Sequence, residues 1–124
     1  MTRTIPIRLM TRDHGERMIQ IKPHWAGKGI AIHKPVSMDP GTGEPAFHHT
    51  RGLWVVTHIH TGMSTGHFMG GLDRAKAFAR QWDEAWAAVT SKSKVPAKLR
   101  KEYLAAFAAA SAGPSRKDLI EARV

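Results

Sequence analysis

The spacing of apolar residues changes once along this chain, near residue 70. Residues 3–10 and several later runs alternate apolar with polar side chains, which is the period of two that a strand with one buried face requires. From Leu72 onward the period is about 3.6, because Ala75 and Ala79 follow at intervals of three and four and share one helix face. Strands followed by helices predict an α+β fold in which the helices cover a sheet.

The strand-like runs predict an antiparallel sheet of about four or five strands within residues 3–69. An Asp-His-Gly turn separates the first two runs, which indicates a hairpin. A third run ends at His33, and residues 24–29 before it are too rich in glycine to predict regular structure. Residues 52–61 carry apolar side chains on both faces, so we expect a central strand there, with residues 67–69 returning beside it.

Two main helices are expected after the sheet, at residues 72–90 and 96–112, both packed on one face of it. A Gly-Pro pair ends the second helix, and a short C-terminal helical turn is expected over residues 115–122. A chain of 124 residues has the usual size of one domain. We therefore expect a single α+β domain over residues 1–124.

The chain contains no cysteine, which excludes a disulfide framework and a zinc site built on thiolates. Its N-terminus lacks the apolar run of a secretion signal. No stretch approaches the roughly 20 apolar residues that are needed to span a bilayer. The composition therefore predicts a cytoplasmic protein without a membrane-spanning segment.

Nineteen Lys and Arg residues against ten Asp and Glu residues give a formal net charge of +9. Such an excess attracts polyanions, of which nucleic acid is the most common, by steering and by counterion release. The strongest basic focus lies in an acid-free stretch and consists of Lys92, Lys94, Lys98, Arg100 and Lys101. Lys28 and Trp25 complete the predicted nucleic-acid contact, since Trp25 is the aromatic side chain that we expect to be exposed for stacking. A solvated, lysine-rich helix start would have the same composition.

No zinc finger, homeodomain, RNA-recognition motif or helix-turn-helix is recognisable, so nothing supports sequence-specific readout. The composition favours a small basic protein that binds nucleic acid, or a complex that handles nucleic acid, without catalysis of its own. An alternative is a regulator or inhibitor of the kind that mobile elements encode, for example against a bacterial defence nuclease. Such a protein would act by contact with an acidic protein surface.

All eight histidines lie between His14 and His67. His58 and His60 are two residues apart on an expected strand, so they share a face at about 6 to 7 Å. A turn at residues 63–64 would place His67 directly opposite His60. Three imidazoles could then hold zinc, and a zinc-bound water would make the chain a metal-dependent hydrolase, the third hypothesis. No carboxylate close in sequence could orient these ligands, which weakens this hypothesis.

Overall fold

A computed structural model of the chain describes residues 3–11, 15–39, 41–48, 50–91 and 94–111. The strands in these ranges are β1 (Ile5–Thr11), β2 (Gly15–Ile21), β3 (Trp25–Ala26), β4 (Ile30–His33), β5 (Val36–Met38), β6 (Pro45–Phe47), β7 (Leu53–His58) and β8 (Ser64–Met69). The helices that follow are α1 (Leu72–Ala87) and α2 (Ala97–Ala110).

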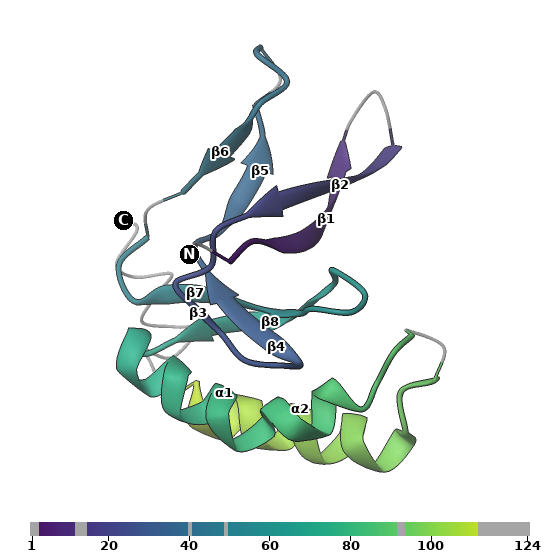
Figure 1. The fold of residues 1–124 in the computed structure, drawn as a ribbon. Coiled ribbons are helices and arrows are strands. Elements are labelled where there is room, and N and C mark those ends of the chain that lie inside the picture. Colours follow the sequence, from purple (N-terminus) through teal and green to yellow (C-terminus); the bar gives the residue numbers. More distant parts are fainter. Residues whose placement is uncertain (1–2, 12–14, 40, 49, 92–93, 112–124) are drawn as a thin grey trace.

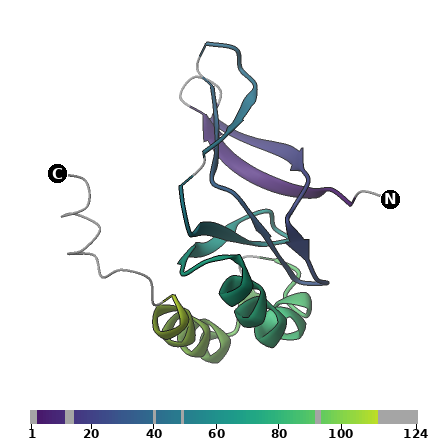
Figure 2. The ribbon, with the colours of Figure 1, turned by 90° about the vertical axis from the view of Figure 1, so that its left-hand side faces the viewer.

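The described strands pair antiparallel and form a central sheet with two hairpins beside it. The central sheet has the order β3-β4-β7-β8, and β1–β2 and β5–β6 are separate two-stranded hairpins. Both helices lie on one side of the central sheet and the hairpins lie on the other side (Figures 1 and 2). The predicted α+β class is confirmed, whereas the one sheet that we expected is divided into a four-stranded sheet and two hairpins.

The inner strands of the central sheet, β4 and β7, are covered on both faces. In β4, Ile30 and Ile32 belong to the core under the helices, while Ala31 between them belongs to a second core under the β1–β2 hairpin. A strand that is covered on both faces needs a nearly continuous apolar sequence, and β4 provides one. The same argument explains the two apolar faces of β7, which lies between β4 and β8, so its predicted central position is confirmed.

The helices follow the predicted periodicity closely. Helix α1 ends three residues before the predicted end at residue 90, and α2 lies within the predicted range of 96–112. Phe78 and Trp86 of α1 are buried against the sheet. The predicted helical turn at residues 115–122 lies outside the described residues. No helix in the described part of the chain is long and apolar enough to cross a membrane.

One carboxylate from α1 holds the turn between β3 and β4. Asp83 accepts hydrogen bonds from the backbone N–H groups of Lys28, Gly29 and Ile30, at 2.9, 2.9 and 3.0 Å. Partial burial opposes the ionisation of Asp83, but these hydrogen bonds outweigh it and lower the pKa of the carboxyl group. The approach is so close that a Cβ atom at Gly29 would overlap the backbone of α1 at Ala87.

This contact explains why the expectation of irregular structure over residues 24–29 is wrong for Trp25 and Ala26. These two residues pair with Ile32 and Ala31 of β4 and form the short edge strand β3. The glycine-rich turn that follows is ordered because Asp83 takes its N–H groups. Nothing local in the sequence indicates an acceptor that lies more than fifty residues away along the chain.

Replacing Asp83 with Ala should lower the free energy of unfolding by about 2 kcal/mol, because three N–H groups lose their acceptor, two of them in buried residues. Urea titration followed by tryptophan fluorescence measures this difference. Glu84→Ala is the matched control, since Glu84 is an exposed neighbour on the same helix and should change stability by less than about 0.5 kcal/mol. Equal stability of the two variants would contradict the role assigned to Asp83.

Candidate functional site

Four of the five predicted basic residues gather at the amino-terminal end of α2. Lys94 precedes the helix, whereas Lys98, Arg100 and Lys101 belong to its first two turns. All four side chains are exposed. The fifth residue, Lys92, lies outside the described residues. These cations are close in sequence, so a single helix end is enough to bring them together.

The backbone at this helix end adds further hydrogen-bond donors. Pro96 occupies the N-cap position, no side chain caps the helix, and its first turn contains no acid. The N–H group of Arg100 is bonded to the carbonyl of Pro96, at 3.0 Å. The N–H groups before it have no carbonyl partner within the helix, and the helix dipole places partial positive charge at the same point. The amino-terminal end of α2 is therefore cationic in both its side chains and its backbone.

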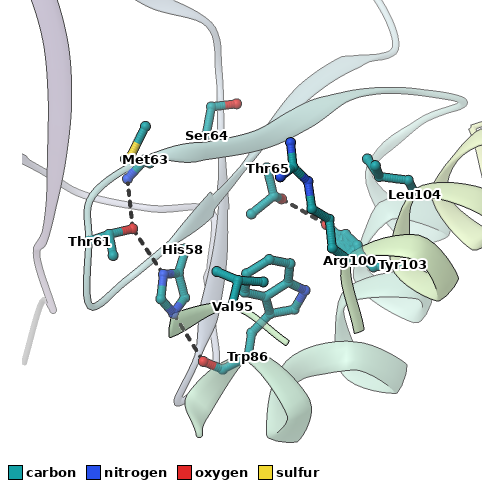
Figure 3. Close-up of a pocket in the computed structure, with 10 residues that line it drawn as sticks. All are labelled: His58, Thr61, Met63, Ser64, Thr65, Trp86, Val95, Arg100, Tyr103 and Leu104. Atoms are coloured by element: carbon teal, nitrogen blue, oxygen red, sulfur yellow. Dashed lines mark hydrogen bonds between the residues drawn. The ribbon is translucent and has the colours of Figure 1, made fainter. Parts of the chain in front are cut away.

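A cavity of about 430 Å³ opens beside this helix end, between α2, the end of α1 and the β7–β8 hairpin (Figure 3). It is lined by His58, Thr61, Met63, Ser64, Thr65, Trp86, Val95, Arg100, Tyr103 and Leu104. Ser64, Arg100 and Leu104 are exposed, whereas His58 and Tyr103 are buried. The cavity therefore passes from a cationic rim to a buried floor that is rich in aromatic rings. We call it the α2 cavity.

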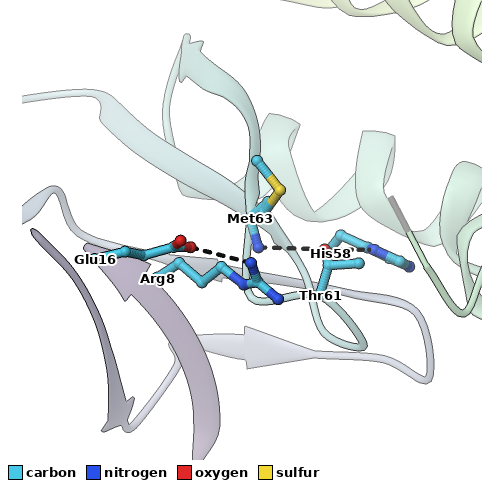
Figure 4. A network of polar contacts seen from close by, with 5 residues as sticks. All are labelled: Arg8, Glu16, His58, Thr61 and Met63. Carbon is cyan, nitrogen blue, oxygen red and sulfur yellow. Dashed lines mark hydrogen bonds and ion pairs between the residues drawn. The ribbon is translucent and has the colours of Figure 1, made fainter. Parts of the chain in front are cut away.

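His58 lies at the bottom of the α2 cavity and has both of its ring nitrogens engaged. Its Nε2 donates to the backbone carbonyl of Trp86 at 3.0 Å, because a carbonyl can only accept. Its Nδ1 then accepts from the hydroxyl of Thr61 at 2.9 Å, and that hydroxyl oxygen accepts the backbone N–H of Met63 at 3.3 Å (Figures 3 and 4). Burial lowers the pKa of His58, although the bond to Trp86 partly opposes the shift. His58 is therefore a neutral link between the β7–β8 turn and α1.

Tyr103 presents an acceptor to the same cavity. The hydroxyl of Thr65 donates to the backbone carbonyl of Val56 at 3.1 Å, so the 2.7 Å contact between Tyr103 and Thr65 has the phenol as donor. Burial raises the pKa of Tyr103, which keeps the phenol protonated. A phenol oxygen that has donated its one proton still has lone pairs to accept with.

Lys28 and Trp25 do not line the α2 cavity. Lys28 is exposed in the β3–β4 turn, as expected, but Trp25 is half-buried and packs against the core on the helix side. The expectation that Trp25 is exposed is therefore wrong, because its strand pairs with β4 and its ring covers the edge of the core. The N–H of Ile59 donates to the carbonyl of Gly29 at 2.8 Å. Lys28 thus lies at the same end of the central sheet as the β7–β8 turn.

The predicted zinc triad is not assembled. His67 lies opposite Val55 rather than His60, because β7 and β8 pair in a different register with a bulge after Val56. His58 faces the helices, so His67 and Val55 lie on the opposite face of the sheet. His60 is exposed beyond the end of β7, with its ring 5.8 Å from that of His58. The described residues contain no group of three His, Cys, Asp or Glu side chains that could hold a metal ion.

A second cavity, of about 250 Å³, is lined by three histidines that are far apart in the sequence. His33, His48 and His67 line it together with Arg8, between the central sheet and the hairpins. His33 is buried, and its Nδ1 donates to the carbonyl of Lys34 at 2.7 Å while its Nε2 accepts from Thr57 at 2.7 Å. Burial lowers its pKa. This cluster depends on how the hairpins fold over the sheet, which is why local patterns do not indicate it.

The free energy of unfolding should fall as the pH is lowered from about 7.5 to about 5.5. His33 and His58 have pKa values below the ordinary 6.5 in the folded protein. The unfolded chain then binds more protons, so their contribution to stability is lost as the pH falls below about 6.5. Urea titrations at several pH values measure this dependence. His58→Gln should make it shallower, whereas the control variant His48→Gln, at an exposed position, should not. A stability that stays level down to about pH 5.5 would contradict the assignment.

Comparison of the chain with protein-family models, with curated proteins and with solved structures finds no match. The chemistry of the residues described above is therefore the basis on which a function can be argued.

Proposed function

We propose that the protein binds nucleic acid, or a complex that carries nucleic acid, through the amino-terminal end of α2, without catalysis of its own. The observation that carries this proposal is the joint exposure of Lys94, Lys98, Arg100 and Lys101 around one helix end. Phosphate oxygens accept strong hydrogen bonds from Lys and Arg side chains and from the N–H groups of a helix N-terminus. Both kinds of donor are present together here.

Little negative charge competes for these cations. Glu102 is the one acid of α2, and its ion pair with Lys98 spans 3.8 Å between two exposed side chains. Exposed pairs of this spacing contribute about 0.3–0.5 kcal/mol, so a phosphate group can replace Glu102. Among the described residues, Lys94, Arg100 and Lys101 have no carboxylate within ion-pair distance. These charges are therefore available to a polyanion.

The groups that line the α2 cavity favour binding over catalysis. His58 is the imidazole among them, and hydrogen bonds within the fold occupy both of its ring nitrogens. No carboxylate is among the ten residues that line this cavity. A serine or threonine hydroxyl needs a nearby free base to become a nucleophile. The lining offers hydrogen-bond partners and apolar walls rather than a base.

Neutralising the helix end should weaken nucleic-acid binding strongly. We expect the variant with Lys94, Lys98, Arg100 and Lys101 all changed to Gln to bind at least about tenfold more weakly at about 50 mM salt. The slope of log affinity against log salt should also decrease, by about 0.7 to 0.9 for each phosphate that the variant no longer neutralises. Fluorescence anisotropy of a labelled oligonucleotide measures both quantities. The melting temperature should change little, because exposed charges contribute little to folding.

The matched control removes the same amount of charge elsewhere, through Gln at Arg17, Lys22, Arg51 and Arg80, which are all exposed. This control should bind more tightly than the α2 variant, since it reduces only the long-range attraction. Equal affinities of the two variants would contradict a localised interface. If neither single-stranded nor duplex oligonucleotide binds at about 50 mM salt, direct binding is refuted, and the acidic surface of a partner protein becomes the preferred ligand.

A further inference from the structure

The α2 cavity has the size and depth of a small-molecule site. Its volume of about 430 Å³ falls within the range of about 300–1,000 Å³ that is typical of ligand pockets. Tyr103 at 1% and Trp86 at 8% exposure form its deep walls, while Leu104 at 55% exposure stands at the rim. A group that enters is therefore covered from several sides. A protein surface that contacts only the outside of a duplex needs no such cavity.

The lining suits a flat body with apolar faces and a polar edge. Trp86, Val95 and Leu104 supply apolar surface on the helix side of the cavity (Figure 3). The Tyr103 oxygen keeps lone pairs with which to accept, because its proton already goes to Thr65, and Arg100 adds donors at the rim. Nucleobases have this character, with π faces that pack on side chains and an edge of donors and acceptors.

The charge at the rim distinguishes between anionic ligands. Arg100 is the one charged residue among the ten that line the α2 cavity, and its side chain extends from α2 toward the β7–β8 hairpin (Figure 3). Lys98 and Lys101 continue the positive charge along the exposed side of the helix. A fatty acid, with a single anionic end, would leave these lysines unused. A polynucleotide carries one phosphate for each base, so successive phosphates can pair with Arg100 and with both lysines.

We infer that the α2 cavity is a nucleotide pocket, which takes one unstacked base of a single strand while Arg100 and the neighbouring lysines hold its phosphates. A base within a duplex is paired and stacked, so it cannot enter without being extruded. The pocket therefore selects single strands. This inference rests on the proposed function for the class of its ligand, and it adds the prediction that individual nucleotides bind.

The test compares single-stranded and duplex forms of one labelled oligonucleotide of about 12 nucleotides, by anisotropy at about 50 mM salt. We expect the single strand to bind at least about tenfold more tightly, since stacking and edge contacts at one base are worth about a factor of ten or more. Nucleoside 5′-monophosphates are titrated separately, with tryptophan fluorescence as the readout, because Trp86 lines the pocket. Saturable quenching is the expected result.

Two rim variants separate the pocket from the cationic helix end. Leu104→Trp narrows the mouth and Leu104→Glu places a negative charge there, at a position that is exposed and lines the cavity. Each should abolish mononucleotide binding and reduce the preference for single strands about tenfold, with duplex affinity retained for Leu104→Trp. Leu104→Met and Leu104→Gln are the controls, and urea titration checks that all four variants fold. If Leu104→Trp does not fold, Leu104→Glu carries the test.

The outcomes separate this inference from the proposed function. Equal affinity for single strand and duplex, with no mononucleotide binding, would overturn the pocket and leave the proposed function standing. Mononucleotide binding without affinity for either oligonucleotide would support the pocket and overturn the proposed function. Single-strand affinity that neither rim variant changes would overturn the pocket. Binding of decanoate, a fatty acid probe, in the absence of mononucleotide binding would also overturn it.

Discussion

The buried polar side chains of the inner strands β4 and β7 need partners within the protein, because the helices cover one face of these strands and the β1–β2 hairpin covers the other. On the hairpin side, His33 and Thr57 satisfy each other across β4 and β7. On the helix side, His58 is held between Thr61 and the backbone of α1. Burial lowers the pKa of both imidazoles and keeps them neutral, although their hydrogen bonds to backbone carbonyls partly oppose the shift. Thr57 and His58, which are adjacent in β7 and face opposite sides of the sheet, thus connect the layers of the fold rather than assembling a metal centre.

Local patterns predicted much of the fold. The two helices, the β1–β2 hairpin and the central position of β7 follow from periodicity and from turn residues close in sequence. The register of β7 with β8 could not be predicted, since a bulge after Val56 and the longer turn before Ser64 shift His67 away from His60. Strand β3 was missed for a similar reason: the carboxylate of Asp83 that orders the following turn is remote in sequence.

The candidate site likewise has one part that the sequence predicts and one part that it does not. The cationic end of α2 was predictable because its charges are contiguous in the sequence, and a helix keeps such neighbours together. The α2 cavity was not predictable, since its walls come from β7, β8, α1 and α2. Of the predicted nucleic-acid-binding residues that the structure describes, Arg100 alone lines it. A charge pattern could therefore indicate that a polyanion binds. The cavity beside the helix, on which the proposed preference for single-stranded nucleic acid rests, depends on tertiary packing.

The hydrogen bonds from the β3–β4 turn to Asp83 also bear on the order in which the chain can fold during synthesis. The N–H groups that it binds precede it by 53 to 55 residues, so β3 and β4 leave the ribosome well before their acceptor exists. Until α1 follows, the helix-side face of the sheet and the open β3–β4 turn remain in contact with water. The nascent sheet is thus an apolar surface of the kind that chaperones bind and that aggregates. Docking of α1 is then a late step that closes the β3–β4 turn, supplies the acceptor for His58 and completes one wall of the α2 cavity.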